Sequence, residues 1–251
     1  YELDAPPTTM ALSAGSPSLS LRDARTADGR SVLMVGGMGH VVGRTASEHE
    51  RVDALRAWTA EHYPDARELA AWSAQDYTSA DGLPRFGPLP RGGGDIRFAS
   101  GFAKWGFTNG TAAAIALSGD ILGEAPPWAH ALPHRSAPLV SPAERARLNA
   151  GVAKEVVTGG ARAVTAPPTT PEVGEGRVHR EGAKIVAESN VDGTVRRVGG
   201  LCTHLAGIVR WNDAERTWDC PLHGSRFTPD GQVLNGPATR PLPCLDPADQ
   251  P

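Results

Sequence analysis

Two cysteines and two histidines near the carboxyl end of the chain form its strongest candidate metal site. Cys202 and His204 are separated by one residue, and Cys220 and His223 follow after a spacer of fifteen residues, 205–219. Thiolate and imidazole groups on two such loops suit either zinc or an iron–sulfur cluster. The residue types therefore predict a metal centre.

The order of the four residues favours one of these metals. A zinc finger typically takes both cysteines from one half of the site and both histidines from the other. Here each half supplies one cysteine and one histidine, so the cysteines can hold one iron and the histidines a second. This order predicts a 2Fe–2S cluster with the metal ligands Cys202, His204, Cys220 and His223, and it leaves zinc as the alternative.

Short strands must position these ligands. Val, Ile and Trp alternate with polar residues beyond residue 175, and turn pairs such as Asp192-Gly193 separate the runs. Five strands are predicted, at 176–180, 184–188, 195–198, 208–211 and 216–219. The segment 205–219 is typical of a hairpin and would bring both ligand loops to one tip. A small all-β domain follows from this pattern.

The ligand segments also resemble a known family. The stretches CTHLAGIVRWN and WDCPLHGSRFTPDGQVLNGPATRPLP resemble a Rieske 2Fe–2S domain over their whole length. The resemblance implies that Gly236-Pro237 forms a loop covering the cluster. It also implies that the Ser225 hydroxyl donates a hydrogen bond to a bridging sulfide.

Two departures from the high-potential Rieske proteins of respiratory complexes bear on the potential. Those proteins carry a disulfide between the cluster loops, whose positions correspond here to Gly207 and Leu222. They also place a tyrosine hydroxyl near a ligand sulfur, where this chain has Phe227. Fewer hydrogen bonds to sulfur stabilise the reduced cluster less, so a low-potential, ferredoxin-like centre is expected.

The first 160 residues are predicted to contain both strands and helices. Strands at 18–22 and 31–35 flank Asp28-Gly29, a hairpin signal, and a helix opens at Ser47 and stops before Pro64. Further elements are predicted as a strand at 67–77, a connector at 84–94, a strand at 95–100, an apolar and therefore buried helix at 109–123, and a helix from 141 to about 157.

Two glycine-rich segments stand out in this region. The segment VGGMGHVVG (35–43) does not fit a dinucleotide loop, because the third glycine of G-x-G-x-x-G falls at Val42 and the next helix opens only at Ser47. The segment SGFAKWGFTNG (100–110) joins a strand to a helix, which suits an anion or an electron-rich ring, or a tight turn required by packing.

Two longer segments of the first 160 residues resemble a flavoprotein. WSAQDYTSADGLPRFGPLP and FASGFAKWGFTNGTAAAIALSGDILG resemble the C-terminal half of FAD-dependent amine and amino-acid oxidoreductases of the D-amino-acid, glycine and sarcosine oxidase group. The order of regions resembles bacterial FAD-dependent oxidoreductases with a fused C-terminal Rieske domain. The resemblance implies FAD contacts at Gly106, Phe107, Thr108 and Asn109, and places VGGMGHVVG on the substrate side of the flavin.

The same alignment bears on reactivity with oxygen. Several oxidases of this group carry a lysine beside the flavin in a G-G-x-G-x-K-x-G segment, and Val41 occupies that position here. A dehydrogenase is therefore expected more than an oxidase, with His40 able to replace the cation in part.

The predicted organisation has an α+β fold class. Residues 1–160 form the C-terminal half of an FAD-dependent oxidoreductase, 161–174 a Pro/Thr linker, and 175–246 a small all-β Rieske domain. The family's N-terminal strand–GxGxxG–helix unit is not found in the 251 residues. The chain is therefore expected to be part of a longer or split polypeptide, and a separate N-terminal FAD-binding segment is an expected partner.

Two functions fit this organisation. The first is an electron-transfer oxidoreductase in which FAD oxidises a small amine or amino acid and passes electrons to the Rieske cluster and a redox partner. The alternative is a Rieske ferredoxin-type carrier with a non-catalytic docking region. A Rieske dioxygenase is disfavoured because none of the residues after His223 is a histidine. No general base is assigned.

Composition excludes other classes. The net charge is −3 and no Lys/Arg run exceeds two residues, which argues against a nucleic-acid partner. The sequence has no run of 18 apolar residues, so no membrane-spanning helix is predicted. Three cysteines do not make a disulfide framework, which predicts either a reducing compartment or a metal, and a cytoplasmic location is expected.

Overall fold

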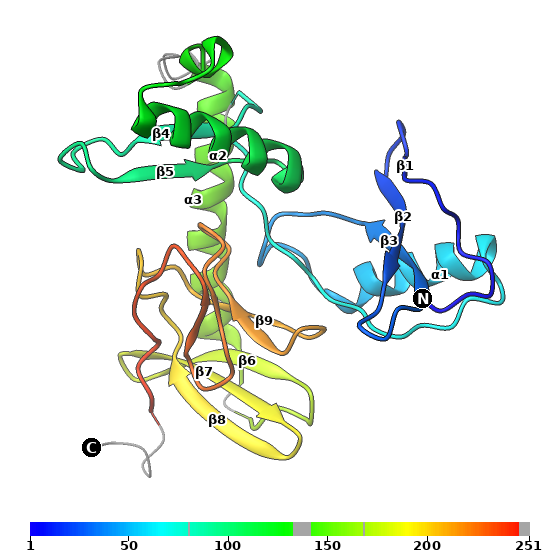
Figure 1. Ribbon diagram of the computed structural model, residues 1–251. Coiled ribbons are helices and arrows are strands. Elements are labelled where there is room, and N and C mark those ends of the chain that lie inside the picture. Colours follow the sequence, from blue (N-terminus) through cyan, green and yellow to red (C-terminus); the bar gives the residue numbers. More distant parts are fainter. Residues whose placement is uncertain (80, 133–141, 168, 246–251) are drawn as a thin grey trace. The chain divides into compact units, whose positions relative to one another are not determined.

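A computed structural model describes residues 1–79, 81–132, 142–167 and 169–245. The chain divides into two compact units, Tyr1–Ser73 with Gly151–Pro251, and Ala74–Ala150. Small antiparallel sheets and helices make up the described residues (Figure 1), which confirms the predicted α+β fold class. Within these residues, each helix is too short or too polar to cross a membrane.

The amino-terminal part of the first unit is a three-stranded sheet with one helix. The strands β1 (Ala11–Leu12), β2 (Leu19–Arg25) and β3 (Ser31–Gly37) pair antiparallel in that order. The predicted hairpin turn between β2 and β3 is confirmed, and Gly29 takes the positive φ of 86° that favours glycine. The helix α1 (His49–His62) stops before Pro64, as predicted.

The carboxyl-terminal part of this unit holds two further antiparallel sheets. β6 (Gly176–Glu181), β7 (Lys184–Val191) and β8 (Thr194–Gly199) form one sheet, and β9 (Arg210–Asn212), β10 (Thr217–Asp219), β11 (Arg226–Phe227) and β12 (Val233–Asn235) form the other, in the order β12-β11-β10-β9. All five predicted strands are present. The strands β11 and β12 were not predicted from the sequence.

One hydrophobic core fills the space in the carboxyl-terminal part. It includes both predicted cysteine ligands and is made of Ala187, Val198, Cys202, Val209, Trp218, Cys220, Phe227, Ala238 and Leu242. Trp218 and Phe227 have no exposed surface, and they are paired across β10 and β11. The cysteines thus belong to the best-packed region of this unit, since residues 186–242 supply most of the buried apolar side chains.

The second unit consists of β4 (Arg85–Pro88), β5 (Arg97–Ser100), α2 (Gly106–Leu122) and the short 3-10 helix η1 (Pro127–His130). The prediction of a plain connector at 84–94 is wrong for its first half, because β4 pairs with β5 in spite of Pro88 at the strand end.

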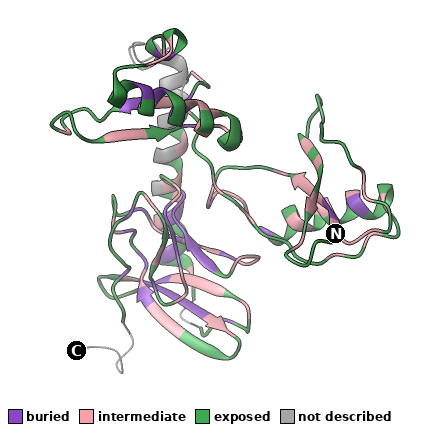
Figure 2. Cartoon of the chain, viewed as in Figure 1, coloured by how far each residue is buried: buried purple, intermediate pink, exposed green. Residues whose placement is uncertain are grey.

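The prediction that the apolar helix is buried is also wrong. Its described surface is largely exposed (Figure 2), with Ile121 66 % and Leu122 73 % exposed, while the buried positions are small residues such as Ala113 and Ala116.

Two further predictions differ from the structure. Residues 68–77 are irregular rather than a strand; the alanine-rich run has low strand propensity, and isolated bridges stand only at its two ends, Glu2 with Arg67 and Thr78 with Phe102. The helix α3 (Pro142–Thr165) continues past Val157 into the stretch predicted as linker, because the first proline after it is Pro167. Ser141, where this helix was expected to open, lies outside the described residues.

Candidate metal centre

Two loops of the first unit carry the four predicted ligands. In each loop the cysteine N–H donates to the carbonyl five residues later, Cys202 to Gly207 at 2.8 Å and Cys220 to Ser225 at 2.7 Å. In each loop the cysteine carbonyl also accepts from the N–H four residues later, at 2.9 Å in both cases. The antiparallel pairing of β9 with β10 places the two loops at one end of the hairpin, as the spacing predicts.

The cysteine sulfurs lie inside the core and contact each other. Cys202 is 3 % and Cys220 2 % exposed. A hydrogen bond between the two thiols lowers the pKa of Cys202 to about 5, helped by the N–H groups of His204 and Leu205 and by the Ser225 hydroxyl. The same bond raises the pKa of Cys220. One sulfur of the pair is therefore held as an acceptor among several donors.

The imidazoles of the same loops are exposed. His204 and His223 meet edge to face, with ring centroids 5.0 Å apart and an interplanar angle of 82°. Among the described residues, no three His, Cys, Asp or Glu side chains converge in a group able to hold one metal ion. The four predicted ligands thus stand as two pairs, a buried thiol pair and an exposed imidazole pair.

The residues that the resemblance placed around the cluster lie at these loops. Ser225 is buried, and its Oγ accepts the Ala238 N–H at 2.9 Å, next to Gly236-Pro237. A Cβ on Gly207 would stand 2.7 Å from Leu222 Cγ, so the two positions of the absent disulfide do face each other.

A buried polar network supports the strand that leads into Cys220. The Asp219 carboxylate, 1 % exposed, accepts hydrogen bonds from Arg226, from the Asn212 amide at 2.9 Å and from the Thr217 hydroxyl at 2.9 Å. The Arg226 guanidinium neutralises it, with Nε–Oδ1 3.1 Å. Because each partner is satisfied, this network fixes the chain direction immediately before the cysteine.

The predicted flavin contacts open α2 in the second unit. Gly106, Phe107 and Thr108 are exposed, with Phe107 88 % exposed, while the Asn109 amide donates to the Phe102 carbonyl at 3.1 Å. Trp105, 57 % exposed, precedes them. The turn therefore presents two aromatic side chains beside the amino terminus of a helix, where the helix dipole is positive.

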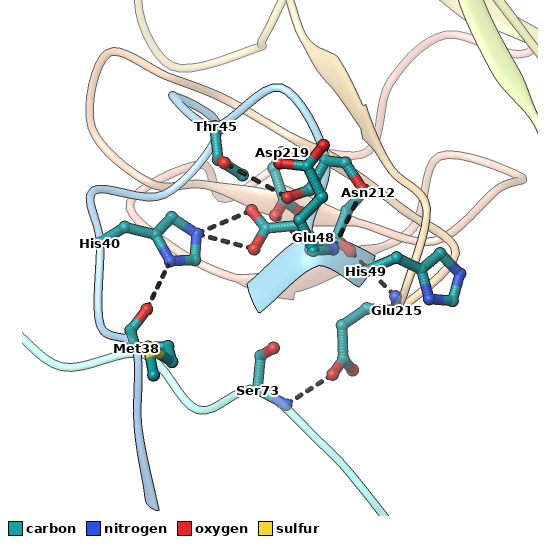
Figure 3. A network of polar contacts seen from close by, with 12 residues as sticks. Met38, His40, Thr45, Glu48, His49, Ser73, Asn212, Glu215 and Asp219 are labelled. Atoms are coloured by element: carbon teal, nitrogen blue, oxygen red, sulfur yellow. Dashed lines mark hydrogen bonds and ion pairs between the residues drawn. The ribbon is translucent and has the colours of Figure 1, made fainter. Parts of the chain in front are cut away.

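The glycine-rich segment 35–43 lies in the first unit and leads to a contact that the sequence did not predict. His40 Nε2 is 2.8 Å from one carboxylate oxygen of Glu48 and 2.7 Å from the other, while its Nδ1 faces the Met38 carbonyl (Figure 3). Val41, the position of the oxidase lysine, is 58 % exposed. The next residues, 42–49, then reach the loop that holds Cys220.

Three sets of contacts join residues 42–49 to the Cys220 loop and to the hairpin of β9 and β10. A Cβ on Gly43 would lie 3.0 Å from the Pro221 nitrogen, and Arg44 Nε donates to the Pro221 carbonyl at 2.9 Å. Arg210 donates to the Gly43 carbonyl at 3.1 Å. The Asp213 carboxylate accepts hydrogen bonds from Ser47 Oγ at 2.7 Å and from the N–H groups of residues 48 and 49 at 2.8 and 3.2 Å.

Comparison with known proteins defines both regions. The family model of FAD-dependent oxidoreductases matches residues 9–118, and that of the Rieske 2Fe–2S domain matches residues 164–246. The chain thus carries an FAD-dependent oxidoreductase domain followed by a Rieske domain, as the resemblances predicted. The first domain implies FAD as a cofactor and the second implies a 2Fe–2S cluster.

Individual curated proteins are similar to this chain. YhfW of Bacillus subtilis, whose name describes a Rieske 2Fe–2S iron–sulfur protein, is 32 % identical over 242 residues, 96 % of this chain and 47 % of its own length. The cytochrome b6-f complex iron–sulfur subunit 3 of Nostoc is 34 % identical over 110 residues, 41 % of this chain and 60 % of that one. The chain therefore spans about half the length of the relative that it matches most broadly here.

A solved structure also matches part of the chain. The plasma membrane Rieske protein PetC3 of Synechocystis shares 32 % identity, covering 28 % of this chain and 72 % of that one with a TM-score of 0.26.

The residues present fit both cofactors. Two thiols at the core and two imidazoles at the surface are the donor set of a Rieske cluster, and hydrogen-bond donors already point at the sulfurs. The exposed aromatic rings and glycine at the start of α2 offer apolar surface to a flat ring.

Proposed function

We propose that Cys202 and Cys220 bind one iron of a 2Fe–2S cluster and that His204 and His223 bind the other. The pairing of the donors supports this, because a cluster with mixed ligation needs two sulfurs together and two imidazoles together. When bound, such a cluster takes up and releases one electron at a time. The exposed imidazoles would be its contact with an outside redox partner.

The chain's own groups around the sulfurs would set the potential. Backbone N–H groups of both loops and the Ser225 hydroxyl donate to the cysteine sulfurs and stabilise negative charge there. Phe227 contributes a fully buried ring and no hydroxyl. The donors raise the potential, whereas the missing hydroxyl at Phe227 and the missing disulfide at Gly207 and Leu222 lower it; we propose a potential near the low end of the Rieske range, roughly −150 mV.

We further propose that the complete protein oxidises a small amine or amino acid. The substrate would lose two electrons and two protons, from its C–H and N–H bonds, and become an imine. A bound FAD supplies the two-electron chemistry, and the electrons would leave singly through the Rieske domain to a one-electron carrier protein. The match to FAD-dependent oxidoreductases supports the oxidation, and the contact of Arg44 with Pro221 in the cysteine loop supports the electron path.

Gly106, Phe107, Thr108 and Asn109 are the proposed flavin contacts. The exposed rings of Trp105 and Phe107 support this assignment, since a ring system at this turn would cover them. The positive end of the α2 dipole would favour the reduced, negatively charged flavin. A cytoplasmic location remains part of the proposal.

The alternative is an electron carrier in which the first region only docks. The exposure of both imidazoles favours it, because a carrier must expose its cluster to two partners. The two functions differ in one measurable respect: whether reduction of bound FAD is followed by reduction of the cluster in the same protein.

Metal analysis and spectroscopy test the proposed centre. The purified chain is expected to hold two irons and two acid-labile sulfides, with the reduced-state paramagnetic signal of mixed cysteine and histidine ligation. Cys202→Ser and His223→Ala should each abolish that signal. Stoichiometric zinc without labile sulfide would refute the cluster assignment. A third measurement reduces FAD by light in the complete protein loaded with FAD and the cluster. If the cluster then stays oxidised, the carrier function is preferred.

A further inference from the structure

The segment 42–49 of the oxidoreductase region is bonded to the Rieske loop that carries two proposed ligands. Arg44 Nε donates to the carbonyl of Pro221, the residue between Cys220 and Leu222. Pro221 is buried, so this carbonyl has little access to solvent as an alternative partner. The guanidinium therefore holds the loop at the peptide between Pro221 and Leu222.

Close packing adds to this bond. Gly43 has a φ of 67°, and a Cβ there would stand 3.0 to 3.2 Å from the backbone of Pro221 and Asp219. Val42 lies on the other side of the loop, its Cβ 3.8 Å from where a Cβ on Gly224 would be. The segment thus touches the loop immediately before Cys220 and immediately after His223.

A second group of bonds anchors the start of α1. Asp213, in the turn between β9 and β10, accepts hydrogen bonds from the Ser47 hydroxyl and from two N–H groups at the helix start. Arg210 reaches the Gly43 carbonyl from the same hairpin. These bonds join the hairpin that positions both ligand loops to the segment that leaves β3.

We propose that residues 42–49 form a fixed docking contact that holds the cluster loop against the oxidoreductase region and sets the rate of electron transfer between them. Arg44 is a positioning residue in this contact. The Rieske domain stays bound to segment 42–49 during electron transfer and does not move between two positions. The rate part of the inference rests on the proposed function, whereas the contact can be tested without any catalysis.

Cysteine trapping tests the contact. Cβ atoms in disulfides are about 3.5 to 4.5 Å apart, which matches residues 42 and 224. In a Cys244→Ser background, Val42→Cys with Gly224→Cys should form a disulfide with oxidised glutathione, which is reduced to two thiols. The matched control is Val41→Cys with Gly224→Cys, since Val41 is 58 % exposed. Equal bond formation in both pairs overturns the docking contact, and so does the absence of the bond in the first pair if the reduced form of that variant still binds the cluster.

Arg44→Met provides the second test, because Gly224 has a φ of 78° and a cysteine there is strained. Loss of the Arg44 bond should increase hydrogen exchange at residues 220–224 while iron content and the cluster signal stay unchanged. Arg51→Met, on the exposed face of α1, is the control. Unchanged exchange in Arg44→Met would argue against a positioning role.

The rate of cluster reduction is measured in the complete protein loaded with FAD and the cluster. FAD is reduced by a light flash, with EDTA as the electron donor. We expect cluster reduction to slow by roughly tenfold or more in Arg44→Met, because small misplacements of reacting groups have large kinetic effects. An unchanged rate overturns the kinetic part of the inference. If the wild-type cluster is never reduced, the proposed function fails, and trapping and exchange still decide the docking contact.

Discussion

Leu222 covers Gly207 across the two ligand loops. A Cβ on Gly207 would stand 2.7 Å from both Cγ and Cδ1 of Leu222, and 2.9 Å from the Cys220 sulfur. High-potential relatives resembled by this sequence use a disulfide at these positions. Here a branched aliphatic side chain packs over a glycine, so van der Waals contact joins the loops without a covalent link.

Gly207→Ala is expected to weaken the metal centre. The added methyl group has to displace Leu222 and press on a ligand sulfur, and overpacking of this kind costs about 1–3 kcal/mol. Cluster content and the midpoint of urea unfolding should both fall, and Leu222→Ala in the same chain should restore part of the loss. Gly160→Ala, with no atom within 4 Å of its added carbon, is the control. Full cluster content in Gly207→Ala would contradict this account.

Ser225→Ala should lower the reduction potential. The hydroxyl donates to the Cys202 sulfur, and a hydrogen bond is worth about 1 kcal/mol, which corresponds to roughly 40 mV for one electron. Phe227→Tyr should move the potential the other way if its hydroxyl reaches a sulfur, as the resemblance implies. A redox titration followed by the paramagnetic signal measures both. Identical potentials in wild type and Ser225→Ala would contradict the role of the hydroxyl.

The link between Asp213 and α1 should weaken in acid. Burial opposes ionisation, but the hydrogen bonds from Ser47 and from the N–H groups of residues 48 and 49 outweigh it and lower the pKa of Asp213 below 3.8. A depressed folded-state pKa adds stability above the unfolded value, and this is lost as the pH falls through the folded value. Asp213→Asn should be less stable than wild type near pH 7, and the gap should shrink below pH 3.8. Urea unfolding from pH 7 to 3 measures this gap; a constant gap would speak against it.

Val41→Lys should increase reoxidation of the flavin by oxygen in the complete, FAD-loaded protein. A cation about 4 Å from developing superoxide contributes up to about 4 kcal/mol at an effective dielectric near 20. The structure gives His40 a carboxylate partner, Glu48, whose negative charge offsets any charge on the imidazole. Stopped-flow reoxidation measures the effect, with Val41→Met as the uncharged control at the same position. Equal rates in wild type and Val41→Lys would contradict the dehydrogenase expectation.

The sequence predicts the ligand loops because their information is local. Each cysteine lies in a short loop closed by its own backbone bonds, and the hairpin between them is marked by alternating residues and a turn. The docking contact depends on pairs far apart in the chain, such as Ser47 with Asp213, 166 residues away. Asp213 reads as an ordinary turn residue, and nothing near Arg44 indicates Pro221 as its partner. The apolar composition of α2 predicts burial, but Ile121 and Leu122 are exposed, because composition alone does not place a packing surface against a helix.

The matched backbone bonds of the two ligand loops have a consequence for assembly. Main-chain hydrogen bonds help to hold the backbone of both cysteines in position, since Cys202 with Gly207 and Cys220 with Ser225 close both loops. A zinc finger, by contrast, has no fold before its ion arrives. We therefore expect the cluster to be inserted into ligand loops that are already folded. A protein that delivers the cluster would then recognise the folded loops and not an unfolded chain.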